Sequence, residues 1–149
     1  MPQPSITVHK FGGAALADLD AFRHAAGIVA SHGGEHPIIV VSAMRGVTDT
    51  LSLIARSAPD KARSALTALE RRHRTVAAGL AGDRVHRAEL TATVASTFDE
   101  LVKVCTHKRR GALDASQLDF VISRGEVLAA SLFVAALENV DCRPPASMR

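Results

Sequence analysis

The segments ITVHKFGG (residues 6–13) and PIIVVS (residues 37–42) decide the fold of this chain. The first segment alternates apolar and polar residues up to its glycine pair, which is the period of a strand with one face better buried than the other. The second segment is a continuous β-branched run, typical of a strand buried on both faces. Between them, apolar residues recur at helical spacing at positions 19, 22, 26 and 29, and Asp18 can cap this helix. Strand, helix and parallel strand form a right-handed βαβ unit, so the sequence predicts an α/β fold.

Helical patterns fill most of the remaining chain. A helix is expected from the loop at residues 42–49 to about Ser57, and Pro59 suits the first turn of the next helix. Apolar seams predict two long helices that pair as an antiparallel hairpin around residues 79–82, the second starting at Gly82-Asp83 and running to about Arg110. Beyond the hairpin we expect a short apolar segment at 115–123, a helix at 125–137 and strand or turn residues at 139–145.

The composition predicts one soluble domain, residues 1–149. Apolar residues make up 47% of the chain, which excludes a mostly disordered protein. With no Trp, no Tyr and 5 Phe, the core must be aliphatic, and stacking platforms for single-stranded nucleic acid are missing. The two cysteines, Cys105 and Cys142, are too few for a disulfide framework or a zinc site, which predicts reduced thiols in a cytoplasmic protein. No apolar run approaches the ~20 residues of a membrane span, so no membrane partner is expected.

Basic residues are concentrated in one region. The formal charge of the chain is +3, yet residues 56–87 alone hold eight Lys or Arg against three acids, and Lys108-Arg109-Arg110 follows. Such a region can bind an anionic partner such as a nucleotide or a nucleic acid, or it can be the solvated face of two helices. We favour the solvated face, and nucleic acid is not expected as a partner because no recognised binding module accompanies the charge.

A first candidate site lies at Lys10-Phe11-Gly12-Gly13, the carboxyl end of the first predicted strand, where open α/β sheets place ligands. Glycines allow backbone N–H groups to approach a phosphate closely, and Lys10 can reach a phosphoryl group in transfer as a point charge. The pattern matches neither a P-loop nor a Rossmann fingerprint. The alternative is a glycine pair that only makes a turn.

Two further segments offer polar groups. In the first, Ser42 and Thr48 carry hydroxyls, Gly46 permits close backbone approach, and Thr48 or Asp49 can simply cap the next helix. In the second, residues 119–126, a Gly-Glu pair opens the predicted helix. Glu126 can there stabilise the helix dipole, or its carboxylate can reach the ammonium group of a substrate.

The three segments together resemble one family. KFGG (10–13), VSAM-x-GVTD (41–49) and DF-x-x-S-x-GE (119–126) are similar to the three N-terminal signatures of aspartokinases, in the amino-acid kinase superfamily. The resemblance implies a three-layer αβα fold with a mostly parallel sheet, helices on both faces and the helical hairpin added. It also implies that Lys10, as catalytic residue, and Gly12 and Gly13 face the phosphoryl group passing from ATP to the β-carboxylate of aspartate. Ser42 would line the same cleft, Thr48 would contact the substrate, and Glu126 would hold the substrate amino group.

Some positions depart from the family pattern. Ala14 and Ala15 stand where the family usually has Thr-Ser, and Arg45 stands where a glycine is typical. The chain ends at Arg149, whereas aspartokinases continue with a second half of the kinase domain that carries the catalytic Asp, a substrate-binding Arg and the nucleotide pocket. We therefore expect a truncated amino-acid lobe without an ATP lobe. It would bind no cofactor alone, and ATP and Mg only if a nucleotide half is supplied.

Two function classes follow from this resemblance. One is a non-catalytic module that binds a small amino acid such as aspartate or serves in assembly. The other is part of an ATP-dependent aspartate kinase completed by another chain. An uncovered apolar sheet edge predicts a homo-oligomer or a partner chain in either case.

Three weaker signals predict ordinary structure. The run His32-Gly33-Gly34-Glu35-His36 has metal-ligand types but lies in a loop, so we expect a solvated turn and no metal site. His73 interrupts an apolar seam and is expected to be a core histidine bonded to a neighbour. Ser123 lacks the G-x-S-x-G frame of a nucleophilic serine.

Overall fold

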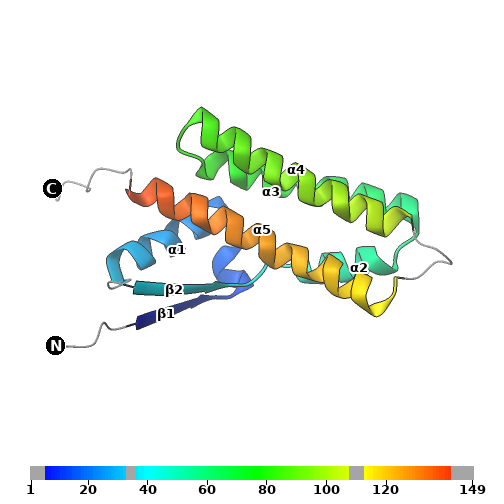
Figure 1. The fold of residues 1–149 in the computed structure, drawn as a ribbon, viewed down its shortest axis with the longest axis horizontal. Coiled ribbons are helices and arrows are strands. Elements are labelled where there is room, and N and C mark those ends of the chain that lie inside the picture. Colours follow the sequence, from blue (N-terminus) through cyan, green and yellow to red (C-terminus); the bar gives the residue numbers. More distant parts are fainter. Residues whose placement is uncertain (1–5, 33–35, 108–112, 142–149) are drawn as a thin grey trace.

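The computed structural model describes residues 6–32, 36–107 and 113–141 (Figure 1). Along the chain the elements are β1 (Ile6–Phe11), the 3₁₀-helix η1 (Gly13–Leu16), α1 (Leu19–His32), β2 (His36–Val41), α2 (Val47–Arg56), α3 (Pro59–Leu80), α4 (Arg84–Thr106) and α5 (Ala115–Asp141). Strands β1 and β2 pair in parallel, from Ile6 opposite His36 to Phe11 opposite Val41. The predicted βαβ unit is therefore confirmed, in a mixed α/β chain that is mostly helical.

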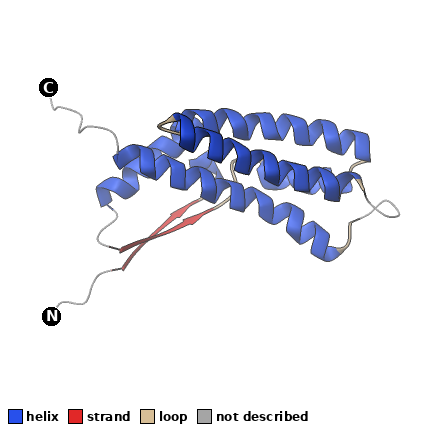
Figure 2. Cartoon of the chain, turned by 45° about the horizontal axis from the view of Figure 1, so that its top comes forward, coloured by secondary structure: helices blue, strands red, loops and turns tan. Residues whose placement is uncertain are grey.

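The sheet is covered on one face. In Figures 1 and 2 the described helices all lie on the same side of the two strands. Phe11 on the inner face packs against Phe133 of α5 in a tilted arrangement, with ring centroids 5.2 Å apart, and Phe22 of α1 packs against Phe133 as well. On the outer face four β-branched side chains are left exposed: Ile6 (65%), Val8 (62%), Ile38 (50%) and Val40 (46%).

Two expectations need correction here. The β-branched run predicts a second strand buried on both faces, and the resemblance implies a three-layer fold with helices on both faces of the sheet. The described residues form two layers, since helices cover only one face of the sheet. Successive side chains of a strand point to opposite faces, so every second side chain of each strand is left on the uncovered face.

Helix α5 is the central element, contacting α1, α2, α3, α4 and β2. It is one continuous helix, so the separate segments expected at 115–123 and 125–137 are wrong, and Asn139 is helical rather than in a strand or turn. Gly125 costs a helix interior about 1 kcal/mol relative to alanine. Packing on several sides outweighs that local cost, which is why the glycine does not start a new helix. Residues 142–145 lie outside the described residues.

The apolar length of α5 also corrects an expectation. Residues 115–140 are long and apolar enough to cross a membrane by length and composition alone, with a mean hydropathy of 1.7 in an 18-residue window. The sequence therefore does contain a stretch of spanning length. In the structure 39% of that window is buried, and Val127 and Val134 are among its exposed side chains.

The predicted helical hairpin of α3 and α4 is confirmed. Pro59 occupies the first turn of α3, and the Asp83 carboxylate caps α4 by accepting from the backbone N–H groups of Val85 (2.7 Å) and His86 (2.9 Å). His73 is fully buried in the seam, where its Nδ1 donates to the Leu69 carbonyl (2.8 Å) and its ring lies 5.3 Å from that of Phe98. Burial lowers the pKa of His73, which favours the neutral ring. The expected core histidine is confirmed.

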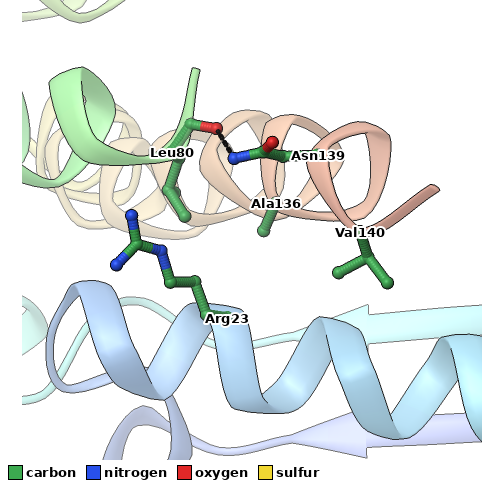
Figure 3. Close-up of a pocket in the computed structure, with 5 residues that line it drawn as sticks. All are labelled: Arg23, Leu80, Ala136, Asn139 and Val140. Carbon is green, nitrogen blue, oxygen red and sulfur yellow. Dashed lines mark hydrogen bonds between the residues drawn. The ribbon is translucent and has the colours of Figure 1, made fainter. Parts of the chain in front are cut away.

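Side chains from other helices bind the carboxyl end of α3 (Figure 3). Arg23 of α1 donates to the Gly79 carbonyl (2.9 Å), and Asn139 of α5 donates to the Leu80 carbonyl (2.9 Å). These are carbonyls that a helix end leaves without an intrahelical partner. Both side chains line a small cavity of about 80 Å³, together with Ala136 and Val140. The contacts join α1, α3 and α5 at one end of the molecule.

Candidate functional site

The first two candidate segments meet because the strands that precede them are parallel and in register. Phe11 and Val41 are paired at the carboxyl ends of β1 and β2. One residue further, the Ser42 N–H donates to the Phe11 carbonyl (3.0 Å). Gly12 and Gly13 therefore lie beside Ser42, at the edge of the sheet where parallel strands place ligands.

Gly13 is needed for a close approach between these two segments. A Cβ atom built on Gly13 would lie 2.9 Å from the carbonyl oxygen of Ala43, a distance that real Cβ atoms essentially never show. Gly12 differs, since a Cβ there would meet nothing within 4 Å. The glycine pair thus does more than make a turn: Gly13 allows the start of η1 to pack on the loop after β2.

The third segment reaches the same point from α5. A Cβ atom on Gly125 would lie 2.9 Å from the Cβ of Ala43 and 3.0 Å from Cγ1 of Val47. Ala43 is buried and contacts a glycine on either side. The three segments that resemble the family signatures therefore converge on Ala43.

Two local expectations at these segments are wrong. Gly125-Glu126 does not open a helix, because α5 begins at Ala115, so Glu126 does not stabilise a helix N-terminus. Thr48 and Asp49 do not cap α2 either. The N-cap residue of α2 is Gly46, which has φ 76° and no side chain to accept a hydrogen bond, and Thr48 and Asp49 lie inside the first turn of the helix. Gly46 serves this left-handed conformation rather than a close backbone approach, since its surroundings are open.

The candidate side chains differ in exposure. Lys10, Thr48 and Glu126 are exposed, whereas Gly12, Gly13 and Ser42 are half-buried. Ala43, Met44 and Val47, which lie between Ser42 and Thr48 in the chain, are buried. Lys10 follows the alternation of β1 and lies on the outer face of the sheet with Ile6 and Val8, while Glu126 belongs to α5, a helix on the other side of the sheet (Figure 1). The structure brings the backbone segments together and places these two charges on opposite sides of the strand ends.

Sequence reasoning missed Arg72 of α3. Its Nη1 donates to the Arg45 carbonyl (2.9 Å) and its Nη2 donates to the Ala17 carbonyl (2.9 Å). One guanidinium thus joins the segment after η1 to the loop before α2. From the sequence Arg72 is one basic residue among several, and no local pattern distinguishes it.

The remaining basic residues of 56–87 are exposed, and Arg74 pairs with Glu70 of the same helix at 2.7 Å. This arrangement is compatible with a solvated face, and the possible anionic partner stays a prediction. Lys108-Arg109-Arg110 lies outside the described residues.

The metal-ligand run, Ser123 and the cysteines form no site in the described residues that the structure could assign. Within residues 6–32, 36–107 and 113–141, no group of three His, Cys, Asp or Glu side chains can hold a metal ion, and Glu35 of the His32–His36 run falls outside that part. Ser123 donates to the Phe120 carbonyl of its own helix (2.9 Å). Cys105 is buried in α4, and Cys142 is outside the described residues.

Comparisons with known proteins agree with this geometry. The model of the amino acid kinase family matches residues 5–147. The chain is 32% identical over 148 residues to the chloroplastic bifunctional aspartokinase/homoserine dehydrogenase 1 of Arabidopsis thaliana, covering 93% of this chain and 16% of that protein. It is 29% identical over 137 residues to the lysine-sensitive aspartokinase 3 of Escherichia coli K12, covering 91% of this chain and 29% of that protein.

Solved structures of E. coli aspartokinase III share the fold. The complex with aspartate and ADP in the R-state superposes with a TM-score of 0.75 at 28% identity, over 92% of this chain and 30% of that one. The T-state complex with lysine and aspartate gives a TM-score of 0.81 at 24% identity, over 91% and 29%. The chain therefore spans less than a third of the length of these relatives.

Proposed function

Because the chain belongs to the amino acid kinase family, we propose that it forms the amino-acid-binding part of an aspartokinase-type site and binds aspartate. One observation carries the proposal. The three segments that resemble the family signatures are far apart in sequence, yet Gly13 and Gly125 both pack on Ala43. The polar residues next to those glycines are thereby held at one edge of the sheet.

The proposed roles follow from the chemistry of the side chains. The exposed Glu126 carboxylate binds the ammonium group of the amino acid, and the hydroxyls of Ser42 and Thr48 bind its polar groups. Lys10 neutralises charge near the β-carboxylate from the other side of the strand ends. Such a site positions a carboxylate as an acceptor, which is most of what phosphoryl transfer asks of the protein.

We propose further that the chain alone does not turn over ATP. Bound ATP would supply the γ-phosphoryl group, to be attacked by a β-carboxylate oxygen with ADP as leaving group. We assign no residue of this chain to Mg²⁺, which in such sites is held mainly by the nucleotide phosphates, water and one or two carboxylates. Ala14 and Ala15 also offer no hydroxyl beside Gly13. Lys10, whose ammonium group can neutralise a phosphoryl group in transfer, favours a second candidate, a kinase completed by another polypeptide that supplies the nucleotide and metal sites.

The same proposal includes protein on the outer face of the sheet. Ile6, Val8, Ile38 and Val40 leave an apolar surface there. A second layer over this face, from another copy or another chain, would complete the three-layer arrangement implied by the resemblance.

Calorimetric titration with L-aspartate tests the amino-acid site. We expect binding by the wild-type chain and at least a tenfold weaker affinity for Glu126→Gln, because a charged hydrogen bond contributes about 1.5–3 kcal/mol. Glu138→Gln is the matched control, since Glu138 is also an exposed glutamate of α5 but lies about 18 Å further along the helix at 1.5 Å per residue.

Three outcomes would contradict parts of this proposal. A wild-type chain that does not bind aspartate refutes the amino-acid site, and equal affinities of wild type and Glu126→Gln refute the role of Glu126. ADP release from Mg-ATP and aspartate by the purified chain alone would refute the absence of turnover.

A further inference from the structure

Arg72 connects two loops that the sheet alone does not hold at a fixed spacing. Its two terminal nitrogens donate to carbonyls of Ala17 and Arg45, each at 2.9 Å. The acceptors are 55 and 27 residues away from Arg72 in sequence, and the bond to Ala17 is partly buried. We name this pair of contacts the Arg72 bridge.

Each end of the bridge lies next to proposed ligand-binding residues. Ala17 follows η1, whose first residue is Gly13. Arg45 precedes Gly46, whose positive φ starts α2 and so fixes where Thr48 lies. Shifting either carbonyl would therefore move one half of the proposed site relative to the other.

The chemistry of the bridge is specific to arginine. A guanidinium is planar and donates from two nitrogens at a fixed separation, so two bonds to two carbonyls also fix the distance between those carbonyls. A lysine ammonium at the same position is a flexible point charge and does not impose that spacing.

We propose that Arg72 is a positioning residue that sets the spacing of the segment 13–17 and the loop 42–48 for amino-acid binding. This inference rests on the proposed function. It also couples the α3–α4 hairpin to the site, because a displacement of α3 moves both loops through one side chain.

Two readouts test the bridge: aspartate affinity by calorimetry, and hydrogen–deuterium exchange of the backbone amides. For Arg72→Lys and Arg72→Gln we expect about tenfold weaker aspartate binding and about tenfold faster exchange confined to residues 13–18 and 43–48. Arg71→Gln is the control. It removes the same charge one residue earlier in α3, and the exposed Arg71 guanidinium bonds none of the described residues. Both readouts should stay within twofold of wild type there.

Several results would overturn the inference. Arg72→Lys binding aspartate within twofold of wild type would do so, and so would exchange that accelerates equally over the whole chain, since that pattern is general destabilisation. If the wild-type chain does not bind aspartate, the proposed function fails separately. Hydrogen–deuterium exchange of the Arg72 variants then tests the bridge by itself. Faster exchange confined to residues 13–18 and 43–48 supports the bridge, and unchanged exchange at these residues refutes it. Arg72→Lys keeps the charge and decides the matter if Arg72→Gln does not fold.

Discussion

Ala43 joins three segments through two different groups. Its backbone carbonyl lies against Gly13, and its methyl group lies against Gly125, where a small side chain is needed. Protein interiors are packed so densely that one added carbon atom changes the stability of the fold. Of the polar candidates, Lys10 is three residues from Gly13, Glu126 is one residue from Gly125 and Thr48 is five residues from Ala43. Small residues in the base of the site thus set the positions of the polar residues at its rim.

Gly125→Ala tests this contact. Alanine improves the local helix propensity by about 1 kcal/mol, yet its Cβ would lie 2.9 Å from that of Ala43 and 3.0 Å from Cγ1 of Val47. We expect the overpacking to prevail and the free energy of unfolding to fall by about 1–2 kcal/mol in urea titrations. Gly27→Ala in α1 is the control, because a Cβ there meets nothing within 4 Å. That variant should gain up to about 1 kcal/mol, and equal gains in both variants would contradict the contact.

At the scale of the elements, local signals succeeded where they agreed with burial. The starts of α3 and α4 follow from Pro59 and the Asp83 cap, and their pairing follows from a regular apolar seam, although α4 ends at Thr106 rather than at about Arg110. Local signals failed in α5, because the glycine at position 125 suggests a helix start whereas packing against five other elements keeps the helix continuous. A glycine inside an apolar helical pattern is itself a signal of close packing, which sequence reasoning here interpreted as a helix start.

The buried His73 makes the stability of the α3–α4 hairpin depend on pH. Its pKa lies below the ordinary 6.5, chiefly because burial disfavours the charged ring. Between that lowered pKa and 6.5 the unfolded chain binds more protons than the folded one. The folded state therefore has its full stability with respect to this group above pH 6.5, and its free energy of unfolding falls as the pH decreases toward and through the lowered pKa of His73 in the folded state. We expect the His73→Leu variant not to show this fall.

Urea unfolding of wild type and His73→Leu at pH 7.5 and pH 5.5 measures the difference. Subtracting the two proteins removes the contribution of His86, whose pKa is raised by its hydrogen bond to Asp83 and whose effect has the opposite sign. An equal loss of stability in both proteins on acidification would contradict the role of His73.

The described part of the molecule is asymmetric, with helices on one face of the sheet (Figure 2) and exposed apolar side chains on the other. The two parallel strands also have no further strand beside them in the described part of the chain. Such surfaces associate with other protein in solution. Because one face of the sheet is uncovered, we expect the chain to associate with other protein as its concentration rises.

We expect the wild-type chain to self-associate at micromolar concentration and the double variant Val8→Thr, Val40→Thr to shift toward monomer in sedimentation velocity. Threonine keeps the β-branched shape that suits a strand, and both sites are largely exposed, so stability should change by less than about 0.5 kcal/mol per site. Val41→Thr makes the same change on the inner face and should cost about 1 kcal/mol or more. A monomeric wild-type chain would contradict this prediction.

The sequence by itself determined the βαβ unit, the hairpin and the meeting of the first two candidate segments. Strand and helix periods are local, and parallel pairing brings the carboxyl ends of two successive strands together without further information. Only the tertiary structure decided the contact of Gly125 with Ala43, the Arg72 bridge, the continuity of α5 and the uncovered face of the sheet. These features depend on which surfaces of distant elements pack together, and on atoms that approach within 3 Å, which no local pattern of residue types encodes.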